Sequence, residues 1–313
     1  MIMRQIIIDT DPGQDDAVAI MLALASSELK VLGITTVAGN VPLELTERNA
    51  LMICEAAGFP NVPVFRGNAE PSKRKLITAE HVHGKTGLDG MKLFEPTIQL
   101  QSTSAVDFII NTIRKHNSNT ITLCPLGPLT NIAEALTKAP DIAARIQQIV
   151  LMGGAYFEVG NVTPTAEFNI FVDPEAAHIV FRSGVPITVL PLDVTHKVLL
   201  TDERILRIAS IGNQMGREVA NMASFFERFD KEKYGSNGAP LHDPTVIAYL
   251  LYPEIFSGRF INVEIETQSE LTRGMTVADW WGVTDRVANA MFIGDVDSDQ
   301  FFEILIERLS KLP

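Results

Sequence analysis

The chain has 313 residues, 46% hydrophobic and 20% charged, a composition that indicates a folded globular protein with a sizeable core and excludes a largely disordered or collagen-like chain. Acidic side chains number 38 and basic ones 26, and the net charge of -12 argues against binding to polymeric nucleic acid or to an anionic membrane surface. The densest basic stretch, residues 73–75, is short and lacks interleaved aromatic residues, so we interpret it as a solvated loop.

The two cysteines and the first residues of the chain both favour a reducing compartment. Cys54 and Cys124 lie in apolar stretches, and neither has the nearby partner that a redox or zinc motif needs, so we expect both in the core. The first residues turn acidic before they reach the apolar length of a signal peptide, and no window approaches the roughly 20 apolar residues of a membrane-spanning helix. We therefore expect a cytoplasmic protein that does not bind membranes.

Short runs rich in Ile and Val alternate with longer helical patterns along the first two thirds of the chain. Strands are predicted at residues 5–8, 31–36, 120–124, 148–152 and 186–190, and helices at 16–24, 43–57, 105–115, 129–136 and 174–182. This alternation is typical of βαβ units whose parallel sheet is covered on both faces. It predicts an α/β fold with an open, mainly parallel, doubly wound (Rossmann-like) sheet.

The last third of the chain is less regular. Helices are predicted at 202–211, 215–229 and 242–251, and strands at 261–266, 275–280 and 290–293, which we expect to extend the edge of the sheet. No linker rich in Pro, Gly or Ser interrupts the chain. Residues 1–313 are therefore predicted to form a single domain with extra C-terminal strands and helices.

The first predicted strand ends in a loop with four carboxylates, those of Asp9, Asp11, Asp15 and Asp16. Mutual repulsion and burial would raise the pKa values of these groups unless a cation is bound between them. The Pro-Gly pair within the loop predicts a tight turn that brings Asp11 and Asp16 towards one point. Oxygen ligands favour calcium and leave magnesium open, whereas zinc would need His or Cys. The alternative, that Asp15 merely caps the following helix, accounts for one aspartate and not for four.

Further polar residues follow other predicted strands, at the carboxyl ends where open parallel sheets bind their ligands. Asn40 follows the strand at 31–36, and the loop after 148–152 carries Asn161, Glu167 and Asn169. These side chains can donate and accept hydrogen bonds in pairs, as the vicinal hydroxyls of a sugar require. For the asparagines, local hydrogen bonding within the loop is the alternative.

The residues at 238–244 precede a predicted helix and allow two interpretations. Asp243 suits the N-cap position, with Pro244 as the first helical residue, and capping alone would account for this aspartate. Alternatively, Asp243 completes a metal site and places His242 beside a leaving group. The spacing leaves both interpretations open.

Taken in order, these segments resemble the inosine-uridine type nucleoside hydrolase family. The likeness begins at residue 4, reaches the region of residue 250, and rests on Asp9-Thr10-Asp11-Pro12-Gly13-x-Asp15-Asp16-Ala17, Val37-Ala38-Gly39-Asn40, His83-Gly84-x-x-Gly87-Leu88, Gly127-Pro128-Leu129-Thr130-Asn131, the segment 161–169 and His242-Asp243-Pro244. The resemblance implies hydrolysis of the N-glycosidic bond of ribonucleosides to ribose and free base, in nucleoside salvage.

The resemblance also implies roles for the site residues. Calcium, one ion per subunit, would be held by the carboxylates of Asp11, Asp16 and Asp243 and the backbone carbonyl of Leu126. The ribose hydroxyls would be bound by Asp15, Asn40, Asn161, Glu167 and Asn169. Asp11 would be the general base for a metal-bound water, which attacks the sugar with inversion through an oxocarbenium-like transition state. Asp9 is left as a support for this loop.

On the base side, the resemblance implies that His242 helps the leaving base, with His83, Phe168 and Tyr234 nearby in a broad or pyrimidine-accepting pocket. It further implies a homotetramer or a homodimer. Two other functions stay open: an inactive nucleoside- or ribose-binding protein on the same scaffold, and a magnesium-dependent phosphohydrolase with a similar Asp-x-Asp strand end. The acidic residues that follow Asp11 disfavour the phosphohydrolase, because they would repel an incoming phosphate.

Overall fold

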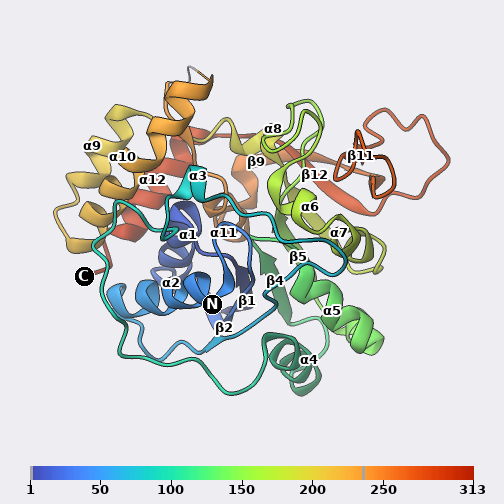
Figure 1. The fold of residues 1–313 in the computed structure, drawn as a ribbon, viewed down its shortest axis with the longest axis horizontal. Coiled ribbons are helices and arrows are strands. Elements are labelled where there is room, and N and C mark those ends of the chain that lie inside the picture. The colour runs from blue at the N-terminus through green and yellow to red at the C-terminus, as the bar shows by residue number, and fades with distance from the viewer. Residues whose placement is uncertain (1–2, 235–236) are drawn as a thin grey trace.

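An eight-stranded sheet runs through the centre of the molecule (Figure 1). The computed structural model describes residues 3–234 and 237–313, with the side chains of 226–234 excepted. The strand order is β3 (Val64–Phe65), β2 (Leu29–Thr36), β1 (Arg4–Thr10), β4 (Ile121–Pro125), β5 (Gln148–Met152), β6 (Ile187–Leu190), β12 (Ala290–Val296) and β9 (Phe256–Ile261). Neighbouring strands are parallel except β12 and β9, which are antiparallel. The predicted mainly parallel, doubly wound sheet is confirmed.

Helices cover both faces of the sheet, because successive apolar side chains of a strand point to opposite sides. On β1, Ile6 and Ile8 pack into one buried cluster and Ile7 packs into the other. The first cluster includes residues of α1 (Gln14–Leu24), α2 (Leu43–Ala56), α9 (Asp202–Ala209), α10 (Gln214–Tyr234), α11 (Pro244–Leu251) and α12 (Ser298–Leu309). The second includes residues of α4 (Ala105–Lys115), α5 (Thr130–Lys138), the 3-10 helix η1 (Pro140–Arg145) and α7 (Pro174–Phe181), and Figure 1 shows the two sets on opposite sides.

The edge of the sheet differs in part from the prediction. Residues 290–293 extend the sheet within β12, as expected, but the expectation for 261–266 and 275–280 is wrong. There, β10 (Val263–Ile265) and β11 (Thr276–Ala278) pair with each other in a separate antiparallel ribbon. The edge strand is β9, which follows a 3-10 helix, η2 (Pro253–Ile255). The four central residues of β9 are exposed, so its sequence lacks the apolar pattern of a buried strand. The helix α12 also lies outside every predicted element.

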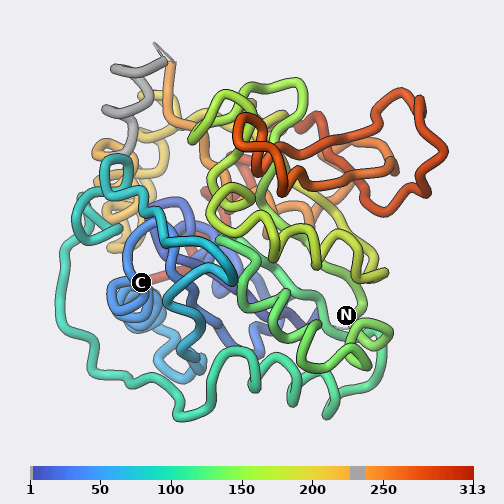
Figure 2. Tube along the Cα trace, turned by 45° about the vertical axis from the view of Figure 1, so that its right-hand side comes forward, coloured from blue at the N-terminus to red at the C-terminus, as the bar shows by residue number. Residues whose placement is uncertain are grey.

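Short elements complete the chain. They are α3 (Glu80–His83), α6 (Phe168–Val172), α8 (Leu192–Thr195) and a ribbon of β7 (Leu199–Leu200) with β8 (Ala239–Pro240). The long segment between β3 and α4, which carries α3, runs along the outside of the molecule in Figure 2. Of the helices in the described part of the chain, none has the combination of length and apolarity that crossing a bilayer demands.

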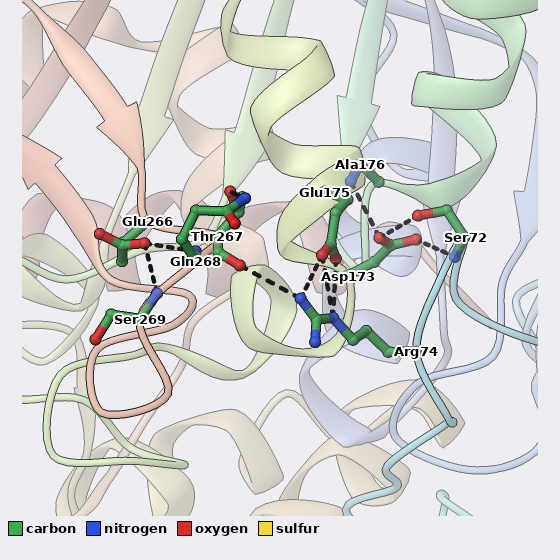
Figure 3. A network of polar contacts seen from close by, with 9 residues as sticks. All are labelled: Ser72, Arg74, Asp173, Glu175, Ala176, Glu266, Thr267, Gln268 and Ser269. Atoms are coloured by element: carbon green, nitrogen blue, oxygen red, sulfur yellow. Dashed lines mark hydrogen bonds and ion pairs between the residues drawn. The ribbon is translucent and has the colours of Figure 1, made fainter.

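The buried carboxylate of Asp173 anchors this outer segment (Figure 3). It caps α7 by accepting from the N–H of Ala176 at 3.0 Å, and it also accepts from the N–H and the hydroxyl of Ser72, both at 2.7 Å. Next to it, Arg74 pairs with Glu175 at 2.5 Å. The segment that carries α3 is thereby tied to the N-terminus of α7.

Candidate active site

A cavity of about 500 Å³ opens at the carboxyl ends of the central strands. Ten of the residues predicted for the site line it, namely Asp15, Asn40, His83, Leu126, Asn161, Glu167, Phe168, Asn169, His242 and Asp243. Asp11 and Asp16 are fully buried and do not line it. Tyr234 was predicted on the base side, but its side chain lies outside the part of the structure that is described. The topology therefore gathers residues from distant segments around one space.

An acidic cluster lies at one end of this cavity. Asp15, Asp16 and Asp243 each place a carboxylate oxygen within 4.8 Å of the other two. Burial, and then repulsion from Asp16, raises the pKa of Asp15 to about 7. Burial, and then the surrounding aspartates, raises the pKa of Asp243 well above its ordinary value. Three ionised carboxylates at this spacing require a counter-charge.

Hydrogen bonds from its own turn and from Asn40 hold the acidic loop in place. Asp16 accepts from the hydroxyl of Thr10 and, at 2.9 Å, from the N–H of Gly13 at the start of α1. Asn40 spans the loop: its backbone N–H donates to Asp11 Oδ2 at 2.7 Å, and its amide donates to Asp16 Oδ2 at 3.1 Å. Asn40 was predicted to bind ribose, and here its side-chain amide also donates to the backbone carbonyl of Asp11 at 3.1 Å, so that it links the two aspartates.

Two glycines enclose the carboxylate of Asp11. A Cβ atom on Gly39 would lie 2.0 Å from Oδ2 of Asp11, and one on Gly127 would lie 2.2 Å from Oδ1. Both distances are far below van der Waals contact, so any side chain at either glycine would displace the carboxylate. The loops after β2 and β4 thus approach Asp11 as closely as backbone can.

The donor set of the cluster fits a hard divalent cation. Oδ1 of Asp11 is buried and has no hydrogen-bond partner among the described residues, and the cluster itself offers carboxylate oxygens, the ligands that hard cations prefer. The Leu126 carbonyl lies at the cavity wall, where it accepts from the Asn169 amide at 2.6 Å. Asp11 lies beside this cluster, since Asn40 donates hydrogen bonds to the carboxylates of both Asp11 and Asp16. The resemblance had placed Asp11 among the ligands and Asp15 on the ribose, whereas the geometry groups Asp15 with Asp16 and Asp243.

The loop after β5 brings its predicted polar residues to the cavity wall, partly engaged with the backbone. Glu167 caps α6, and its carboxylate accepts from the N–H groups of Asn169 at 2.9 Å and Gly154 at 3.0 Å. Burial raises the pKa of Glu167 to about 7. Asn161 accepts from the N–H of Phe168 at 2.9 Å. Asn161 therefore makes the local hydrogen bond of the alternative interpretation and also lines the cavity.

Two histidines, His83 and His242, also line the cavity. Nδ1 of His242 lies 2.7 Å from Oγ1 of Thr195, and Nδ1 of His83 lies 2.7 Å from Oε1 of Gln14. Burial lowers the pKa of His83 to about 3 and that of His242 well below its ordinary value, so both rings are neutral. A neutral imidazole can donate one hydrogen bond and accept another.

The structure separates the two interpretations of Asp243. It occupies the N-cap position of α11, and Pro244 is the first helical residue, as predicted. Its carboxylate, however, makes no capping hydrogen bond and lies in the acidic cluster instead. The geometry thus favours the metal-site interpretation over simple capping.

Several residues of the cavity were missed from the sequence. They include His81, Val82, Met152, Glu158, Val159, Val162, His196, Leu199 and Pro240. His196 and Glu158 form a hydrogen-bonded pair at 3.1 Å, and the His196 ring centroid is 5.7 Å from that of His242. The position of His196 shortly after β6, at the carboxyl edge of the sheet, is the signal that could have found it.

A protein-family model described as inosine-uridine preferring nucleoside hydrolase matches residues 6–303. The chain belongs to this family. This nucleoside hydrolase is 53% identical over 309 residues to an uncharacterised protein of Schizosaccharomyces pombe, covering 99% of this chain and 100% of that protein. It is 48% identical over 308 residues to a protein of Shewanella sp. (strain ANA-3) named pyrimidine-specific ribonucleoside hydrolase RihA, covering 98% and 96% of the two chains.

Solved structures agree with this assignment. A purine-preferring ribonucleoside hydrolase from Gardnerella vaginalis superposes with a TM-score of 0.92 at 36% identity, covering 98% of each chain. A plant nucleoside hydrolase superposes with a TM-score of 0.90 at 32% identity, covering 98% of this chain and 99% of that one. The predicted family and the predicted class of enzyme, a glycosidase that hydrolyses nucleosides, are confirmed.

Proposed function

We propose that this nucleoside hydrolase is calcium-dependent and cleaves ribonucleosides to ribose and free base at the cavity beside the acidic cluster. The observation that carries the proposal is the cluster itself, in which three buried carboxylates lie close to Oδ1 of Asp11, an atom without a hydrogen-bond partner in the described part of the chain. Carboxylates of Asp11, Asp16 and Asp243 and the carbonyl of Leu126 are the proposed ligands. A bound divalent cation lowers the pKa of water, which supplies a nucleophile at neutral pH.

Asp11 is the proposed general base. Its Oδ2 accepts from Asn40, whereas Oδ1 is available to take the proton of the attacking water. The enclosure of this carboxylate by backbone keeps its position fixed during the reaction. Attack by water without a covalent intermediate predicts inversion at the anomeric carbon.

The ribose is proposed to lie against the polar wall of the cavity. The groups that bind its hydroxyls are those of Asp15, Asn40, Asn161, Glu167 and Asn169. Carboxylates fixed at the cavity would stabilise the positive charge that develops on the sugar as the glycosidic bond breaks. Asp9 supports the loop from behind, since it accepts from the Asn131 amide at 2.8 Å and lies outside the cavity lining.

His242 is proposed to donate a hydrogen bond to the leaving base, with His83, Phe168 and Tyr234 completing the base side. A broad or pyrimidine-accepting preference is supported by the relatives named pyrimidine-specific at 48% identity. We further propose that the enzyme acts as a homotetramer or homodimer in cytoplasmic nucleoside salvage. Light scattering coupled to gel filtration measures the number of subunits in the assembly.

The function is tested with inosine, uridine and cytidine, by measuring reducing-sugar release in calcium and in excess chelator. We expect release in calcium and its loss in chelator, restored by added calcium. No release from any nucleoside in calcium would sink the proposal. Calcium-dependent binding without turnover would favour the ribose-binding alternative, and phosphate release from nucleotides in magnesium would favour the phosphohydrolase.

A further inference from the structure

Thr195, the last residue of α8, contacts His242 and has no role in the chemistry described so far. Its Oγ1 lies 2.7 Å from Nδ1 of His242, and the residue is fully buried and does not line the cavity. We propose that Thr195 is a positioning residue, whose hydroxyl donates to Nδ1 and thereby presents the Nε2–H of His242 to the leaving base. This inference rests on the proposed function of His242.

The direction of this hydrogen bond follows from the partners available. A neutral imidazole has one donor and one acceptor nitrogen, and the hydrogen bond at one nitrogen decides where the proton sits. Within residues 3–234 and 237–313, Nδ1 of His242 is the hydrogen-bond partner of the Thr195 hydroxyl. If Nδ1 carried the proton, the buried hydroxyl would have to accept it and its own O–H would be left unsatisfied. Donation from Thr195 satisfies both groups.

The backbone fixes the distance between the two side chains. The ribbon pairs Leu199 of β7 with Pro240 of β8, and the N–H of Leu241 donates to the carbonyl of Val198 at 2.9 Å. His242 follows Leu241 directly, and the N–H of Val198 donates back to the carbonyl of Thr195 at 3.0 Å. The segments that carry Thr195 and His242 therefore cannot slide past each other without breaking this ribbon.

Helix α8 is itself anchored to the wall of the cavity. The carboxylate of Asp193 accepts from three successive backbone N–H groups, those of Tyr156 at 2.9 Å, Phe157 at 2.6 Å and Glu158 at 3.3 Å. At the N-terminus of α8, Leu192 donates to the carbonyl of Gly154 at 2.9 Å. The hydroxyl of Thr195 thus projects from a short helix that is hydrogen-bonded to the loop beside it. A hydroxyl held in this way is suited to fixing the orientation of the His242 ring.

The test compares Thr195→Val, which removes the hydroxyl at nearly constant shape, with Thr195→Ser, which keeps it. We expect Thr195→Val to lower kcat for uridine by about 10- to 100-fold, because the hydrogen bond from His242 to the charge that develops on the leaving base is no longer aligned, with little change in KM. Thr195→Ser should restore most of this loss. A nitrophenyl riboside, whose leaving group needs no proton, should lose much less. Equal losses on both substrates would mean a merely structural role and would overturn the inference.

A double-mutant cycle and a spectrum complete the test. In a His242→Ala background, Thr195→Val should lower kcat no further, because the ring that Thr195 holds is gone; additive losses would contradict the inference. In the wild type labelled with ¹⁵N-histidine, NMR should show the Nε2–H tautomer for His242, and an Nδ1–H tautomer would overturn it. The NMR measurement needs no turnover, so it tests this inference separately from the proposed function. The proposed function would be contradicted if the wild type released no ribose.

Discussion

The carboxylate of Asp11 combines three features that are individually common and together point to one use. It is fully buried, its Oδ2 accepts from the N–H of Asn40, and its Oδ1 has no partner in the described part of the chain. Burial, and then the charge of Asp16, raises its pKa well above the ordinary value. A carboxylate held so firmly, with one free oxygen, suits both metal binding and proton transfer.

We expect Asp11→Asn to separate activity from stability. The amide keeps the shape between the two glycines but removes the charge and the base, so kcat should fall by about 10²- to 10⁴-fold or more. In chelator, the unfolding temperature should stay constant or rise, because one repelling charge is lost from a buried cluster. Steady-state kinetics and thermal unfolding measure the two effects. Asp285→Asn, at an exposed aspartate, is the control with the same charge change, and activity of Asp11→Asn within tenfold of wild type would contradict the role.

For His242, the prediction concerns the leaving group. His242→Ala should reduce kcat for uridine or inosine by about 10²- to 10³-fold, the loss of one hydrogen-bond donor to the negative charge that develops on the leaving base, and reduce turnover of a nitrophenyl riboside far less. Initial rates on the two kinds of substrate give the comparison directly. Equal losses on both would refute the role as hydrogen-bond donor to the leaving base, and His178→Ala, at a histidine of α7 outside the cavity lining, should leave both rates unchanged.

At the scale of elements, the anchor at Asp173 ties the segment that carries α3 and His83 to the second helical layer. Asp173 accepts from Ser72, from Ala176 and, at 2.8 Å, from the hydroxyl of Thr130 at the start of α5. One carboxylate therefore caps α7 and joins α5 and the outer segment to it. Losing it would leave several buried donors without an acceptor.

We predict that Asp173→Ala destabilises the protein by roughly 2–5 kcal/mol, because the helix cap and the buried hydrogen bonds are lost together. Urea unfolding measures this change, and limited trypsin digestion should cut faster in the basic stretch at 73–75. The matched control is Asp297→Ala, which removes an exposed cap of α12 and should cost about 1 kcal/mol. If Asp173→Ala lowered the free energy of unfolding by no more than the control does, the segment would not be held by this anchor.

At the scale of the whole molecule, the buried acids make folding depend on pH and metal. Burial foremost raises the pKa values of Asp9, Asp15 and Glu167 to about 7, and the pKa values of Asp11 and Asp243 also rise. The metal-free folded state therefore binds protons more tightly than the unfolded chain does. Its free energy of unfolding decreases as pH rises from the unfolded pKa values near 4 through 7 and above.

In chelator, we expect a lower unfolding temperature at about pH 8 than at about pH 5, since the acids ionise between these values. Added calcium should raise the unfolding temperature more at the higher pH, because the ion binds the ionised carboxylates. Thermal melts at the two pH values, with and without calcium, test this. Equal calcium stabilisation at both, or no effect of pH in chelator, would contradict the linkage.

The regular part of this fold was predictable because its strands are buried on both faces and its helices are long. On β1, three successive isoleucines divide between two cores, and a short apolar run of this kind is a local signal. The last third of the chain offered no such signal. Strand β9 exposes four of its six residues, and β10 and β11 carry a strand pattern that does not specify their partner strands.

The site was predictable to the extent that one segment held its chemistry. The acidic loop could be found from charge spacing alone, because four carboxylates within eight residues demand a cation. Thr195 and Glu158 could not, since each acts through contacts with distant segments and their local sequence carries no motif. The amides of Asn40 and Asn169 were assigned to ribose, and the contacts that engage them within the protein follow from tertiary packing.

Because two glycines enclose the carboxylate of Asp11, substitutions at Gly39, Asp11 and Gly127 depend on one another. A methyl group at Gly39 or Gly127 would displace the carboxylate, and a longer acid in place of Asp11 would strike the backbone that approaches it from both sides. No one of the three can be exchanged alone for a larger residue, so changes here would have to be compensated together. Asp15 and Asp243, by contrast, border open space in the cavity. Variants meant to alter the proposed metal site should therefore begin with Asp243, on that open side.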